Sequence, residues 1–141
     1  MLEDGGPFVD PVLDLLGGAL SVSAGLRAPP PRREQRALED LKRYTINHLG
    51  DPTLSPARVA SACFVSVRQL HRLFAGEHTT FGVFLRQSRL RQCRRDLADP
   101  RLASLTIGDI ARHNGYRNAA TFTRSFTERY GQGPRAFRSA R

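Results

Sequence analysis

The sequence predicts an all-α fold in which two helix-turn-helix units are joined by a long helix. The main observation is a pattern that occurs twice: an apolar residue followed by Ala, a Ser or Asn able to cap a helix, and an apolar-x-Arg-x-Phe string. The copies are Val59, Ala60, Ser66, Leu70, Arg72 and Phe74, and Ile110, Ala111, Asn118, Phe122, Arg124 and Phe126. Two short helices with a tight turn, present twice, suit entry into two successive grooves of a DNA duplex.

Composition is the second observation. The 141 residues can form one domain or two small ones, and a hydrophobic content of 40% supports modest cores. The net charge of +9 is uneven, because residues 1–31 carry a net −3 and residues 32–141 carry 21 basic and nine acidic side chains. This excess indicates a polyanionic partner. Lys42 is the only lysine, a preference that a GC-rich genome would also produce, but codon bias does not explain the excess over acids.

Other chemistries find little support. Cys63 and Cys93 lie in predicted helices among apolar neighbours, so we expect small buried hydrophobes in a reducing cytoplasm. The apolar stretch 12–24 follows acidic residues and is interrupted by Gly, which argues against a signal peptide or membrane anchor. The histidines have no metal-ligand spacing, and phosphate-binding and hydrolase motifs are missing. We therefore expect no enzyme activity, no cofactor and no metal.

The chain divides into four predicted parts. Residues 1–33 combine an apolar run with Pro29, Pro30 and Pro31, which indicates a short amphipathic helix on a proline-stiffened linker, or else a partly disordered tail. Residues 34–79 form the first helix-turn-helix subdomain, 80–98 the linker helix, and 99–141 the second subdomain.

The first subdomain contains three predicted helices. Leu38, Leu41, Thr45 and Leu49 recur at helical spacing over residues 34–49, before a stop at Gly50, Asp51 and Pro52. Ser55 and Pro56 then start a helix that runs to about Cys63. Ser66 with Gln69 has the spacing of a capping box at the start of a helix over 66–76.

The linker helix and the second subdomain follow. Residues 80–98 carry an apolar stripe and end at Asp99 and Pro100. Thr106 with Asp109 forms a second capping box, and Gly115 makes the turn. Asn118 caps a helix over 118–130, which ends at Gly131. A last helical turn over 134–139 covers the core with Phe137.

The outward residues between the apolar anchors are the candidate DNA contacts. They are Arg68, Gln69, His71 and Arg72 in the first copy, and Ala119, Ala120, Thr121, Thr123, Arg124 and Ser125 in the second. Arginine can bind guanine through two hydrogen bonds, Gln can pair with adenine, and Ala or Thr methyls can meet the thymine methyl. A phosphate contact or a solvated surface residue is the alternative for each.

Over residues 36–139 the chain resembles the DNA-binding domain of AraC/XylS-type bacterial transcription regulators. The most specific part is Thr106, Ile107, Asp109, Ile110, Ala111, Gly115, Tyr116, Asn118, Phe122, Arg124, Phe126, Tyr130, Gly131, Pro134, Phe137 and Arg138. Leu70, Arg72, Phe74, Arg89, Leu90 and Leu97 agree in the first half. The resemblance implies an all-α, seven-helix arrangement of two helix-turn-helix subdomains joined by a long linker helix.

The resemblance also implies a function. The helices over 66–76 and 118–130 would enter adjacent major-groove segments of double-stranded DNA. Carried over by position, the base contacts would be Arg68, His71, Arg72, Ala119, Ala120, Thr121 and Arg124, and Ser66, Asn118 and Thr121 would be phosphate contacts. RNA polymerase is the expected protein partner, a membrane is not expected, and the family's effector and dimerisation domain is expected to be absent from this chain.

Some features depart from the family. Phe64 stands in a turn where glycine is common, which predicts a more rigidly packed or displaced turn. Gly133 stands where a serine often precedes the proline, and His113 and Asn114 replace more apolar residues. The chain is either a stand-alone regulator or a fragment of a longer one. A DNA-repair alkyl acceptor or a helical adaptor for acidic proteins is the alternative function.

Overall fold

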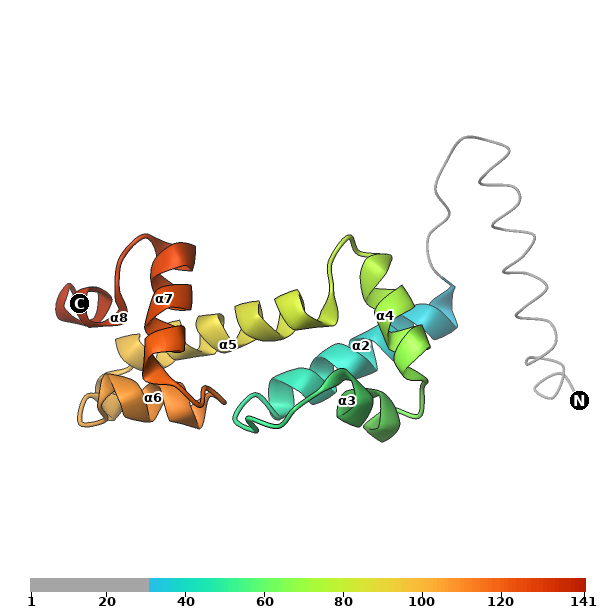
Figure 1. The fold of residues 1–141 in the computed structure, drawn as a ribbon, viewed down its shortest axis with the longest axis horizontal. Helices are drawn as coiled ribbons and strands as arrows, with labels where there is room; N and C mark the ends of the chain where they lie inside the picture. The colour runs from blue at the N-terminus through green and yellow to red at the C-terminus, as the bar shows by residue number, and fades with distance from the viewer. Residues whose placement is uncertain (1–30) are drawn as a thin grey trace, which may run out of the picture. The chain divides into compact units, whose positions relative to one another are not determined.

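The computed structural model describes residues 31–141, and Ala37–Arg141 form one compact unit. The predicted N-terminal helix and most of its proline-rich linker therefore lie outside the described residues. Between residues 31 and 141 the chain forms seven α-helices and no strand (Figure 1). The all-α prediction is confirmed. None of these helices combines the length and apolarity that crossing a bilayer requires.

The first three helices surround the first core. They are α2 (Arg32–Asn47), α3 (Pro56–Ala62) and α4 (Val67–Ala75). The buried residues of this core are Leu38, Leu41, Leu54, Val59, Ala60, Leu70, Leu73, Phe74 and Phe81. Ala60, with 1% of its surface exposed, gives α3 a small residue at its contact with α4, as the sequence pattern predicts.

The long helix α5 (Phe81–Ala98) belongs to two cores. Phe81 at its start is buried in the first core, whereas Leu90, Cys93 and Leu97 are buried in the second. The helix therefore turns its apolar surface to different partners along its length. Figure 1 shows α4 and α7 toward opposite ends of α5.

The second core is rich in aromatic rings. A short 3-10 turn, η1 (Pro100–Leu102), leads to α6 (Ile107–His113), α7 (Ala119–Tyr130) and α8 (Pro134–Ser139). Phe126 is central, with ring centroids 5.6 Å from Phe122 and 5.7 Å from Phe137. Leu90, Cys93, Leu97, Ile110 and Ala111 complete the buried set.

Local hydrogen bonds account for most helix starts. Thr106 and Asp109 form both bonds of the predicted capping box, at 3.0 and 2.9 Å. At Ser66 only one of the two bonds is found, because its hydroxyl accepts the Gln69 N–H at 3.0 Å while the Gln69 side-chain oxygen accepts from Arg72. The start of α4 is therefore capped by the serine.

The departure at Phe64 has a different outcome from the one expected. Its backbone takes the left-handed conformation, with φ of 60°, so the turn keeps the shape that glycine favours. The ring is 94% exposed, so the expectation of a more rigidly packed turn is wrong. The aromatic side chain therefore lies in solvent and not in the core.

Candidate nucleic-acid interface

The outer face of α4 carries the first set of predicted contacts. Leu70, Leu73 and Phe74 are buried beneath the helix. With that face fixed, Arg68, His71 and Arg72 are exposed, and Gln69 is half-buried. The helical period thus separates the anchors from the polar residues, as the sequence predicts.

Gln69 and Arg72 act as a pair on this face. Arg72 Nη2 donates to Gln69 Oε1 at 3.0 Å. The two residues are three apart, so they lie on neighbouring positions of the helix surface. The guanidinium of Arg72 and the amide nitrogen of Gln69 are N–H donors, and the Gln69 oxygen already accepts one hydrogen bond. Such a face suits acceptor atoms, which guanine and phosphate both provide.

The outer face of α7 carries the second set. Phe122 and Phe126 are fully buried at 0% exposure, whereas Thr123 and Arg124 between them are exposed. Ala119, Ala120, Thr121 and Arg124 are all exposed. These predicted contacts comprise one arginine and several methyl groups, so their chemistry differs from that of the set on α4.

Asn118 has a structural task at the start of α7. Its Oδ1 accepts from the N–H of Ala120 at 2.8 Å and of Thr121 at 3.2 Å. These bonds satisfy two of the N–H groups that a helix leaves open at its start. Asn118 therefore orients the first turn of α7, where three of the predicted contacts lie.

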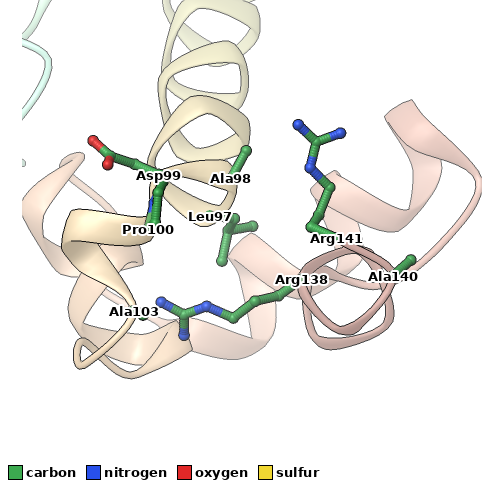
Figure 2. Close-up of a pocket in the computed structure, with 8 residues that line it drawn as sticks. All are labelled: Leu97, Ala98, Asp99, Pro100, Ala103, Arg138, Ala140 and Arg141. Carbon is green, nitrogen blue, oxygen red and sulfur yellow. The ribbon is translucent and has the colours of Figure 1, made fainter.

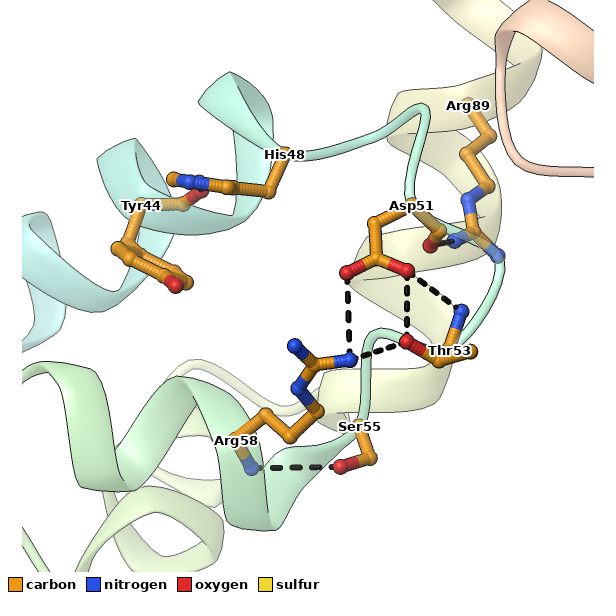
Figure 3. Close-up of polar contacts among 7 residues, drawn as sticks. All are labelled: Tyr44, His48, Asp51, Thr53, Ser55, Arg58 and Arg89. Carbon is orange, nitrogen blue, oxygen red and sulfur yellow. Dashed lines mark hydrogen bonds and ion pairs between the residues drawn. The ribbon is translucent and has the colours of Figure 1, made fainter.

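A polar network holds the loop before α3 (Figure 3). Asp51 accepts from the N–H and hydroxyl of Thr53, at 2.8 and 2.6 Å, and forms an ion pair with Arg58 at 3.3 Å. The Thr53 side chain and backbone, followed by Arg58, hold the pKa of Asp51 below its usual value. Arg58 is thus engaged by its own loop, unlike the outward arginine Arg68.

The structure places the predicted residues in two groups. Ser66, Gln69 and Arg72 are linked by hydrogen bonds at one end of α5, and the α7 group lies toward the other (Figure 1). Sequence reasoning missed two exposed apolar side chains next to the first group, Phe64 and Val67, the latter 40% exposed. A phenylalanine in a position typical of glycine was the available signal.

A surface hollow lies away from both groups. It has a volume of about 580 Å³ and is lined by the end of α5, η1 and α8. Figure 2 shows Arg138 extending across it toward Ala103. Arg138 donates to the carbonyl oxygens of Leu105 at 2.6 Å and Leu102 at 2.8 Å, so it joins α8 to the segment between α5 and α6.

The two cysteines lack the properties of an activated thiol. Cys93 is fully buried, and burial raises the pKa of its thiol to about 12. Burial, together with Asp40, also raises the pKa of Cys63. Alkyl acceptors need a thiol of lowered pKa in an exposed, electropositive place. The geometry therefore gives the alkyl-acceptor alternative no support.

Comparisons with known proteins agree on the kind of domain. A family model described as a helix-turn-helix domain matches residues 59–140. The transcriptional activator NphR from Rhodococcus sp is 28% identical over 131 residues, which are 93% of this chain and 38% of the relative. The chain thus spans well under half the length of that relative.

Solved structures share the fold. A transcriptional regulator from Chromobacterium violaceum, described as AraC-type and DNA-binding, is 25% identical with a TM-score of 0.68, over 74% of this chain and 91% of that one. The DNA-binding domain of the global transcriptional factor AdpA, solved in complex with a target DNA, is 20% identical with a TM-score of 0.65 over the same shares.

Proposed function

This chain belongs to the AraC-type helix-turn-helix family, and on that premise we propose that it binds specific sequences of double-stranded DNA and regulates transcription. The recognition helices are α4 and α7, which enter adjacent major-groove segments. One observation supports this most directly: two helices each expose a distinct set of side chains over buried aromatic or aliphatic anchors.

On α4 we assign base contacts to the polar set. Arg72 and Arg68 suit the two acceptors of guanine, and the exposed His71 and the half-buried Gln69 lie between them in the sequence. The Arg72–Gln69 hydrogen bond restrains both side chains before DNA arrives, which reduces the entropy that binding must remove. Arg72 is therefore the residue on which sequence specificity depends most.

On α7 we assign weaker discrimination. The methyl groups of Ala119, Ala120 and Thr121 suit contact with thymine methyls, and Arg124 suits a phosphate. Ser66 and Asn118 cap the two helices, so the open N–H groups beside them are placed to bind phosphates. These contacts would set the register of the protein on the duplex.

Other parts of the proposal concern the cellular setting. RNA polymerase is the expected partner, because the relative NphR is named a transcriptional activator. A DNA partner would place the protein in the cytoplasm of a bacterium. The division into 1–33, 34–79, 80–98 and 99–141 stays part of the proposal, with the two middle boundaries at the ends of α5.

Selection of bound duplexes from a random pool tests the function. Simultaneous docking of α4 and α7 predicts a long asymmetric site with two motifs about one helical turn apart. A single short motif would show that one helix alone makes base contacts. Equal recovery of all sequences would indicate instead a protein whose positive surface serves an acidic protein partner.

The substitution Arg72→Ala tests the assignment of α4. It should weaken binding to the selected site by about 1–3 kcal/mol and relax specificity at one base position. The matched control is Arg95→Ala, which removes an exposed arginine from the last turn of α5, outside both recognition helices, so any loss of affinity should be the same for all duplexes. If Arg72→Ala behaves like this control in binding assays, α4 does not contact bases through Arg72.

A further inference from the structure

Arg89 lies in the middle of α5 and connects the two helix-turn-helix units. We propose that Arg89 is a positioning residue which locks the units in one relative orientation and so sets the spacing of the two DNA motifs. The lock consists of Arg89, the loop 49–51 of the first unit and Gly115 of the second. The proposal rests on the proposed function, since it concerns how α4 and α7 engage DNA together.

The first half of the lock is a pair of hydrogen bonds. Arg89 Nε donates to the carbonyl oxygen of Leu49 at 3.0 Å, and Nη2 donates to that of Asp51 at 2.7 Å. Figure 3 shows the guanidinium against the backbone at Asp51. Burial lowers the pKa of Arg89, but a guanidinium stays charged throughout the physiological range. Both bonds are therefore charge-assisted and stronger than ordinary ones.

The second half is close packing of Gly115. This residue is buried with φ of 88°, and a Cβ there would lie 2.3 Å from the Leu49 oxygen and 2.7 Å from Arg89 Cζ. A Cβ on Gly50 would lie 2.7 Å from the His113 oxygen. The loop 49–51 thus contacts the turn 113–115, and both segments also contact the guanidinium of Arg89.

The turn 113–115 of the second unit is also held to α5. Asn114, with 4% exposure, donates from Nδ2 to Asp96 Oδ2 at 2.8 Å and to the Ile110 oxygen at 2.9 Å. Gln92 donates to the other Asp96 oxygen at 2.9 Å. Asn114, which stands where the family has a more apolar residue, therefore fixes the position of the neighbouring Gly115.

These contacts restrain a motion that α5 alone does not prevent. A single helix between two cores can bend or let each core shift around it. The lock adds a lateral connection between the units. It is formed by the planar guanidinium of Arg89, which donates to two carbonyl oxygens at once. Lysine has one ammonium and cannot reproduce that geometry. The two recognition helices then keep a constant separation, which a duplex must match.

The orientation of the units can be measured without DNA. Spin labels at Ala75→Cys on α4 and Glu128→Cys on α7, both exposed positions, report the distance between the recognition helices in the full chain carrying Cys63→Ser. We expect a narrow distance distribution, which broadens in Arg89→Met and is intermediate in Arg89→Lys. The control Arg95→Met removes the same charge from α5 and should leave the distribution unchanged.

The second measurement uses duplexes in which the two selected motifs are moved apart or together by two base pairs. The unchanged protein should lose affinity on the order of 100-fold, because one unit can no longer engage. Arg89→Met should lose less than about tenfold across the series, since loosened units can adapt. Circular dichroism checks that each variant is folded. If Arg89→Met does not fold, Arg89→Lys replaces it in both measurements.

The outcomes separate this proposal from the function on which it rests. A distance distribution unaltered by Arg89→Met overturns the lock. A broadened distribution with the spacing preference of the unchanged protein overturns the claim that the lock sets spacing. If the unchanged protein binds a single motif, docking of both helices is wrong and the spacing claim falls with it, while the spin labels still decide whether the lock exists.

Discussion

Arginine has two separate roles in this chain, and its hydrogen-bond partners distinguish them. Arg89 and Arg138 each donate to two backbone carbonyls that are far away in the sequence. Arg68 on α4 and Arg124 on α7 are exposed. The first pair joins backbone segments that are far apart in the sequence, whereas we propose that the second pair contacts DNA. An arginine in the sequence pattern can therefore serve either the fold or the binding of DNA.

Removing Arg138 should lower stability without altering DNA contacts. Arg138→Met loses two charge-assisted bonds, so we expect the free energy of unfolding to fall by about 2 kcal/mol. Arg135→Met, an exposed position on the same helix, is the control. Urea denaturation at equilibrium measures both. Equal effects of the two substitutions would show that the carbonyl contacts contribute nothing specific.

Phe64 permits a test of backbone strain. A left-handed conformation costs a non-glycine residue about 1–2 kcal/mol, and the ring is too exposed to lose packing when removed. Phe64→Gly should therefore raise the free energy of unfolding by about 0.5–1 kcal/mol, after the backbone entropy of glycine is subtracted. Phe64→Ala keeps the strain and should change little. The same thermal stability in Ala and Gly variants would contradict this account.

At the scale of the elements, sequence predicts helix starts well because capping is local. Ser55, Ser66, Thr80, Thr106 and Asn118 each accept an N–H from the first turn of the helix that follows. The predicted and observed helices consequently agree to within about two residues at most ends. The two recognition faces also follow from helical period alone, since buried anchors leave one side outward.

Features that depend on distant partners could not be predicted in this way. The sequence pattern predicts only that the helix over 80–98 ends at Asp99 and Pro100, and the structure has the 3-10 turn η1 there. Arg89 and Arg138 match the family pattern, but the sequence does not indicate their partners, because these lie 40, 38, 33 and 36 residues away. Local pattern carries no information about such carbonyls. The lock between the units was invisible for the same reason.

The start of α8 is an exception among the caps. Gly133 stands at the N-cap with φ of −71° and ψ of 162°, and provides no side-chain hydrogen bond. A Cβ there would meet only Thr127 Oγ1 at 3.8 Å, so a serine fits. We expect Gly133→Ser to raise the free energy of unfolding by about 0.3–0.5 kcal/mol through a new cap.

Gly131 gives this prediction an opposite control. Its φ of 77° makes Gly131→Ser strained even though the space around it is open. The same substitution two residues earlier should thus lower the free energy of unfolding by about 1 kcal/mol. Denaturant titration of both variants measures the signs, and a shared sign would refute the assignment of capping to one and strain to the other.

For the whole molecule, the two units have the same fold but different surfaces. Both are built on buried anchors and joined through α5, yet the predicted contacts on α4 are mainly arginines with a histidine and an amide, while those on α7 are methyl groups and one arginine, Arg124. Hydrogen bonds to base edges discriminate more strongly than methyl contacts, because a wrong base leaves donors unpaired. The lock holds these unequal surfaces at one separation on the duplex.

This asymmetry predicts unequal penalties along the bound site. Single-base changes in the motif bound by α4 should cost about 1–3 kcal/mol each, and those in the motif bound by α7 distinctly less. Competition with singly substituted duplexes measures the penalty at every position. The motif bound by α4 is identified with Arg72→Ala, because in this variant the penalty for a base change should vanish at one base pair of that motif. If both motifs show equal penalties, α7 discriminates through contacts other than its methyl groups, and Arg124 would be the first residue to test.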